Sequence, residues 1–133
     1  MTSNRFDEIL KSIVGLLERG QIPPPHAIMI TPLKPLIVIG LLAKKRDELV
    51  RTINEKLPDM IRKANPSMVC LVLPLSEIED YEEDSILILK FTSSTVEAYR
   101  LIINDQVKIV KTDVDPIFQG VVQAIRDSYT PYL

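Results

Sequence analysis

The amino-acid sequence predicts one α+β domain covering residues 1–133, in which N-terminal, central and C-terminal helices pack on a sheet. The predicted sheet is mixed but mostly antiparallel, with about five strands and one βαβ crossover. Three observations lead to this fold class. The 133 residues suit one compact domain, and 46% hydrophobic with 26% charged residues is typical of a globular chain. Three segments repeat apolar residues at helical spacing, and short aliphatic runs lie between them.

Three amphipathic segments predict the helices. The first covers residues 6–17, where an apolar stripe opposes charged and polar side chains, and Gly20 can end it in the left-handed conformation. The central helix covers residues 45–64. Within it, Pro58 predicts a kink or a break into two helices, because proline removes a helical hydrogen-bond donor. The last helix starts near Pro116, a residue that suits the first turn.

Runs of aliphatic and β-branched residues predict the strands. The first two runs flank a turn bracketed by prolines, so they can form a hairpin. The second run, the central helix and the third run have the order of a right-handed crossover between parallel strands. The last three runs favour an antiparallel half, since Asn104 and Asp105 suit a tight turn. The runs are residues 27–31, 36–42, 67–73, 86–92, 95–103 and 107–111.

Charge and cysteine content narrow the classes of function. Sixteen Lys and Arg against 18 Asp and Glu give a net charge of −2, which supplies no overall attraction to nucleic acid or anionic lipid. Cys70 is the single cysteine, which excludes an intrachain disulfide and a cysteine-cluster metal site. The longest apolar stretch, residues 36–43, is far shorter than the ~20 residues of a membrane span. Acidic residues near the N-terminus disfavour a secretory signal, so we expect a cytoplasmic protein without membrane contact.

A basic line along the central helix is the candidate nucleic-acid surface. Lys44, Arg51 and Arg62 fall on nearly one helical line at 3.6 residues per turn. Acidic residues lie beside this line, and no aromatic residues or glycine-rich phosphate loop accompany it. We therefore favour a salt-bridged solvent face over a nucleic-acid site, with nucleic-acid binding kept as an alternative.

The acidic segment 77–84 is the candidate surface for a basic partner or a divalent cation. It includes Glu79, Asp80 and Glu82, and carboxylate oxygens are the ligands that Mg²⁺ and Ca²⁺ prefer. The spacing matches no known cation loop, so we favour a solvated connection between strands. His26, the one histidine, lies near no catalytic motif, and we expect an ordinary loop or edge residue.

A small metal-dependent hydrolase or nuclease is the enzymatic alternative. Such an enzyme needs acids and a lysine on neighbouring strands, and Asp84, Glu97 and either Lys90 or Lys108 could supply them. Acid and lysine residues also alternate on exposed strands of many proteins, so this pattern is weak. The sequence predicts no catalytic, cofactor-binding or metal-binding residue and no cofactor.

The apolar content favours a function in assembly. Two amphipathic terminal helices and several aliphatic strands offer more apolar surface than a chain of this size readily buries. A symmetric homodimer buries such surface, and either a terminal helix or an unpaired strand edge can form its interface. The sequence therefore favours a small, non-enzymatic protein–protein interaction or assembly domain that pairs with itself, with an unidentified protein partner also possible.

Overall fold

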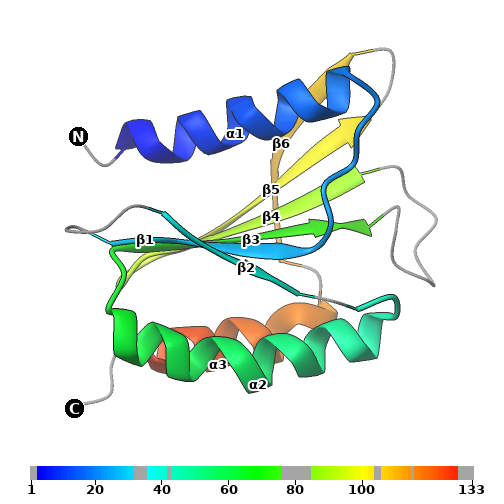
Figure 1. Cartoon of the computed structure of the whole chain (residues 1–133). Helices are drawn as coiled ribbons and strands as arrows, with labels where there is room; N and C mark the ends of the chain where they lie inside the picture. The colour runs from blue at the N-terminus through cyan, green and yellow to red at the C-terminus, as the bar shows by residue number, and fades with distance from the viewer. Residues whose placement is uncertain are drawn as a thin grey trace.

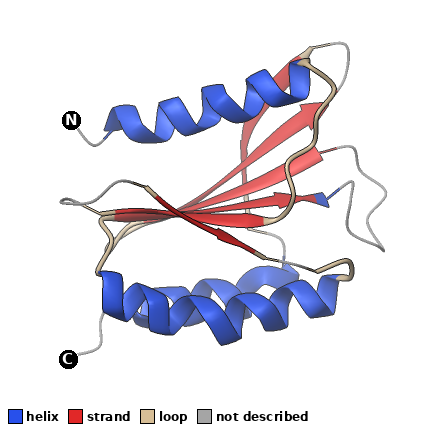
Figure 2. Cartoon of the chain, in the orientation of Figure 1, coloured by secondary structure: helices blue, strands red, loops and turns tan. Residues whose placement is uncertain are grey.

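The computed structural model describes residues 3–31, 36–41, 43–75, 85–103, 106–114 and 116–128. Within these residues a six-stranded sheet has the order β2-β1-β3-β4-β5-β6. Helix α1 covers one face of the sheet, while α2 and α3 lie side by side on the other (Figures 1 and 2). The α+β class is therefore confirmed. In chain order the elements are α1 (Ser3–Glu18), β1 (His26–Ile30), β2 (Ile37–Gly40), α2 (Arg46–Ala64), β3 (Met68–Pro74), β4 (Ser85–Phe91), β5 (Val96–Ile103), β6 (Val107–Thr112), the 3-10 helix η2 (Pro116–Phe118) and α3 (Gln119–Ser128).

The sheet corrects the prediction in strand number and direction. It has six strands in the described part of the chain, where we expected about five, and its five pairings are antiparallel instead of mixed. The pairings do not show the expected βαβ crossover, because no two described strands pair in parallel. Helix α2 connects β2 to β3, but β1 lies between these strands and pairs with both. The predicted hairpin explains this arrangement, because β2 folds back on one edge of β1 and leaves the other edge to β3.

Helix α2 runs unbroken through Pro58, so the expected break into two helices is wrong. Proline at this position leaves the carbonyl of Asn54 without its helical donor. Asn54 lies on the exposed side of the helix, where water can bond that carbonyl. On the opposite side, Ile53, Leu57 and Ile61 are buried, and this packing holds the helical turns on both sides of Pro58 against the core. The kink that the sequence also predicts stays a prediction.

Both long helices end in left-handed residues. Gly20 follows α1 with φ 74°, as the sequence predicts, and its N–H donates to the carbonyl of Leu17 over 3.0 Å. Asn65 ends α2 with φ 49°, and its N–H donates to the carbonyl of Ile61. Pro66 follows Asn65 and cannot continue the helix.

Alternate residues of each central strand enter two separate cores. In β3, Val69, Leu71 and Leu73 belong to the core under α2 and α3. Cys70 and Val72 belong to the core under α1. Because helices cover both faces, β3 is buried over its whole length, which explains its continuous apolar run.

Candidate functional site

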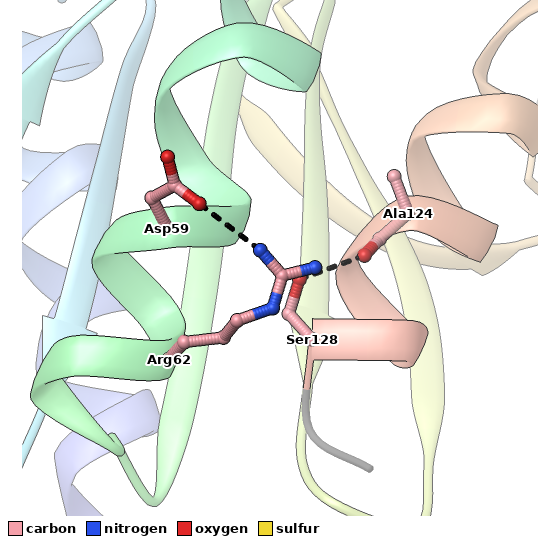
Figure 3. Close-up of polar contacts among 4 residues, drawn as sticks. All are labelled: Asp59, Arg62, Ala124 and Ser128. Atoms are coloured by element: carbon pink, nitrogen blue, oxygen red, sulfur yellow. Dashed lines mark hydrogen bonds and ion pairs between the residues drawn. The ribbon is translucent and has the colours of Figure 1, made fainter. Parts of the chain in front are cut away.

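The predicted basic line does not form one helical surface. Lys44 precedes α2, which starts at Arg46, so it cannot extend the line along the helix. Arg51 and Arg62 are both exposed on α2. Arg62 donates to Asp59 over 3.0 Å, and the close-up places this ion pair beside Ser128 of α3 (Figure 3). The charge of Arg62 is therefore neutralised by Asp59, and both the salt-bridged solvent face and the nucleic-acid alternative stay predictions.

The acidic candidates Glu79, Asp80 and Glu82 lie outside the described residues, as does Asp84. Among the residues that the structure describes, no group of three or more His, Cys, Asp or Glu side chains is placed to hold a metal ion. None of the helices in those ranges is both long and apolar enough to cross a membrane.

Glu97 and Lys90 are brought together on neighbouring strands, whereas Lys108 is not. Lys90 and Glu97 are register partners of β4 and β5, on the face that α1 covers. Lys108 alternates with residues of that face and points to the other side of β6. The side chain of Tyr99 donates a hydrogen bond to Glu97, and Lys111 Nζ lies 3.7 Å from Glu97 Oε2.

This polar cluster fixes the protonation of its two acidic groups. The hydrogen bond from Tyr99, followed by the charges of Lys90 and Lys111, holds the pKa of Glu97 below its usual range. Burial and the hydrogen bond to Glu97 raise the pKa of Tyr99 to about 12. At neutral pH the carboxylate of Glu97 is ionised and the phenol of Tyr99 keeps its proton. Each group therefore already has a hydrogen-bond partner in the other.

The cluster anchors the start of α1 on the sheet. The ring of Phe6 lies 5.1 Å from the ring of Tyr99, and Lys90 Nζ lies 4.6 Å from the centre of the Phe6 ring. These contacts tie the buried first turns of the helix to β4 and β5. We therefore interpret the cluster as a structural clasp for α1.

His26 and Cys70 also have ordinary surroundings. His26 opens β1, is half-buried, and lies with its Nδ1 2.8 Å from the Pro24 carbonyl, to which that nitrogen can donate. Cys70 is completely buried beneath α1, and burial raises the pKa of its thiol to about 12. Such a thiol stays protonated at neutral pH and is a poor nucleophile.

Grooves lie beside α1 on its face of the sheet. In the described part of the chain one helix crosses this face (Figure 1), and residues of α1 line a groove on each of its two sides. We call the larger groove, of about 480 Å³ between α1 and β6, the β6 groove. Its apolar lining consists of Leu10, Val14, Gly15 and Ile109, and its charged rim of Asp7, Lys11 and Glu18.

The second groove, which we call the β2 groove, lies between α1 and the β1–β2 hairpin and has a volume of about 280 Å³. Leu36 and Val38 contribute apolar surface to it, and Val38 is 63% exposed. Arg5, Ser12 and His26 are among its polar residues.

Sequence reasoning missed both grooves. The apolar stripe of α1 shows which face of the helix is buried, but it does not show how much of the sheet that face covers. One signal was present in the sequence, since Gly15 lies inside the segment that the apolar periodicity predicts as a helix, where glycine is unfavourable.

Comparison with family models, curated proteins and solved structures finds no match to this chain.

Proposed function

We propose that this domain acts through protein–protein contact without catalysis, and that it assembles with a second copy of itself through the α1 face of the sheet. The observation that carries the proposal is the unequal covering of the two faces. Among the described residues, two helices, α2 and α3, cover one face together, whereas α1 is the one helix on the other. We place the domain in the cytoplasm, because its single cysteine, Cys70, is a buried free thiol and a reducing compartment keeps thiols free.

Exposed apolar side chains mark the uncovered part of this face. Ile109 of β6 is 48% exposed in the β6 groove, next to the partly exposed side chains of Leu10 and Val14. A contiguous apolar surface rimmed by charged residues is typical of a protein–protein contact. A second copy that covers this surface removes it from water, which is the main driving force of association.

The mass of the protein in solution tests this proposal. We expect light scattering, measured from low micromolar to near-millimolar concentration, to show a reversible dimer. Ile109→Glu places a charge in the groove and should weaken association at least about tenfold. Val110→Glu is the matched control, because Val110 is the next residue of the same strand, is 43% exposed, and faces the opposite side of the sheet. It should dimerise like the parent protein.

Two results would contradict the proposal. One is a protein that stays monomeric at the highest concentration. The other is a dimer that Ile109→Glu and Val110→Glu weaken to the same extent, which would place the contact away from the α1 face.

A further inference from the structure

We propose that strand β2 pairs antiparallel with β2 of a second copy, so that two sheets join edge to edge about a two-fold axis that passes beside Val38. This contact goes beyond the proposed function, because it uses the edge of the sheet and not the surface around Ile109. It is the weaker of the two contacts, since only a strand of four residues and its immediate neighbours take part.

Strand β2 has unpaired backbone groups along its outer side. It forms one edge of the sheet (Figure 1), and among the described strands only β1 pairs with it. The N–H of Leu41 donates to the carbonyl of Pro25 over 2.9 Å, and these two residues continue the register of the β1–β2 pairing. Hydrogen-bonded residues alternate along an antiparallel ladder, so Ile37 and Ile39 also turn their backbone groups toward β1. The alternate residues of β2 therefore turn theirs to the free side.

These alternate residues, Val38 and Gly40, indicate what kind of segment can bind the edge. Their N–H and C=O groups repeat at a two-residue spacing, and the backbone of another extended strand bonds such a row. Charged residues and proline protect an edge strand from this pairing, and β2 contains neither. The opposite edge strand, β6, carries Lys108 and Lys111. Between the two edges of the sheet, β2 is therefore the one that accepts a further strand.

The side chains around β2 indicate that the further strand is β2 of a second copy. With the axis beside Val38, this residue faces its own copy, and Leu36 faces Gly40 of the other chain. Val38 and Leu36 are 63% and 42% exposed and line the same β2 groove. Val38 would cover its copy, and Leu36 would lie over a residue that has no side chain and has open space where one would be. The strand is therefore complementary to itself, with no charge opposed to another.

The other face of the joined strands supports the same register. Ile37 and Ile39 are half-buried against the core under α2 and α3, and each would face the other residue of the second copy. Moving the axis to Ile39 would oppose Val38 to Gly40 and place Leu36 beyond the last residue of the other β2. The axis beside Val38 therefore pairs the most backbone groups and covers the most apolar surface.

The symmetry of this contact leaves the α1 face available. A two-fold axis normal to the sheet pairs two copies of one strand antiparallel and keeps each face of the sheet on its own side. Both α1 helices would lie on one face of a continuous sheet, and the two β2 grooves would meet along Val38. Strand β6, with Ile109, lies at the far edge of each sheet. The contact of the proposed function can therefore form in the same assembly.

Amide hydrogen exchange tests the backbone pairing. We would use Ile109→Glu, which removes the contact of the proposed function, and measure exchange from low micromolar to near-millimolar concentration. At the upper end the amides of Val38 and Gly40 should exchange at least about fivefold more slowly, whereas those of Ile37 and Ile39, already bonded to β1, should change little. Exchange at Val38 and Gly40 that does not depend on concentration would overturn the inference.

Disulfide trapping tests the place of the axis. In the Ile109→Glu background, Val38→Cys should link to its copy under mild oxidation at least about tenfold faster than Val110→Cys. Val110 is the matched control, because it is also an exposed valine of an edge strand but lies on β6. Cys70 is buried and does not compete. Equal rates of linking for the two variants would overturn the inference, and circular dichroism checks that both are folded.

The outcomes separate this inference from the proposed function. A dimer that Ile109→Glu disrupts, with neither protection nor trapping at Val38, would overturn the inference and leave the proposed function standing. Protection and trapping at Val38, in a protein whose mass Ile109→Glu and Val110→Glu change equally, would overturn the proposed function and leave the inference standing. A protein that is monomeric at every concentration and is not trapped at Val38 would overturn both.

Discussion

The two faces of the sheet differ in how completely helices cover them. On the α2 and α3 face, Leu49, Ile53 and Leu57 have no exposed surface at all. On the α1 face, the corresponding helix residues Ile9 and Ile13 are 6% and 3% exposed to solvent. Since the helices are amphipathic on both faces, the difference comes from the number of helices and not from their sequence. A sheet of six strands is wider than one helix, and the uncovered width becomes a groove.

The two edges of the sheet differ as well. β6 carries Lys108 and Lys111, whereas the residues of β2 carry no charge and Val38 on it is 63% exposed. Strand β2 is only four residues long, and a short edge strand offers few groups for pairing. The comparison teaches that β6 carries charges along its edge and exposed apolar side chains on both faces, with Ile109 on the α1 face and Val110 on the other. Only Ile109 lies in a groove beside α1.

Truncating the central isoleucine of each helix should give the largest effect. We expect Ile53→Ala to cost about 3–4 kcal/mol of unfolding free energy, because α3 and the sheet enclose the resulting cavity. Ile13→Ala should cost about 2–3 kcal/mol, because α1 has no neighbouring helix in the monomer and can settle into the space. Urea unfolding of both variants at low micromolar concentration checks this order. Equal costs would show that the two faces are equally rigid.

Replacing Gly15 by alanine should stabilise the monomer. The helix gains up to about 1 kcal/mol when glycine becomes alanine, and the new methyl group meets only Arg19 at 3.9 Å. Thermal unfolding of the dilute protein measures the gain. A loss of stability would mean that contacts within the chain require glycine at this position.

The clasp at the start of α1 should give a smaller, pH-dependent effect. The folded pKa of Glu97 lies below its ordinary 4.5, so its contribution to stability is present above that pH and is lost as the pH falls through the folded value. The folded pKa of Tyr99 is raised from 10.0 to about 12, so its contribution is present below pH 10.0 and is lost as the pH rises toward 12. We would measure the urea midpoint of unfolding as a function of pH. Compared with the parent protein, the midpoint should fall less at acid pH in Glu97→Gln and less at alkaline pH in Tyr99→Phe. Unchanged profiles would contradict the clasp.

Local patterns in the sequence were sufficient for the elements but not for their assembly. The three helices, the β1–β2 hairpin and the left-handed Gly20 follow from periodicity and backbone preference, which act over a few residues. The place of β1 between β2 and β3 depends on which strand edge remains free after the hairpin forms, and no local pattern records that. The continuity of α2 through Pro58 depends on packing against the sheet, which overrides propensity.

The candidate surface was less predictable than the fold. The sequence favoured assembly through a terminal helix or a strand edge, but it did not indicate the β6 groove. A groove depends on how far a sheet extends beyond its covering helix, and that distance follows from the strand order. The sequence marks Ile109 only as a strand residue, and its exposure follows from the place of β6 at the edge of the sheet.

Light scattering of Ile109→Glu and Val110→Glu beside the parent protein tests the central claim most directly. The two substitutions place the same charge on adjacent residues of β6 that are 48% and 43% exposed and face opposite sides of the sheet. The account predicts that the parent and Val110→Glu dimerise, whereas Ile109→Glu is monomeric at the concentration where half of the parent is dimeric. A parent protein that is monomeric throughout, or two variants that dimerise equally well, would contradict the account.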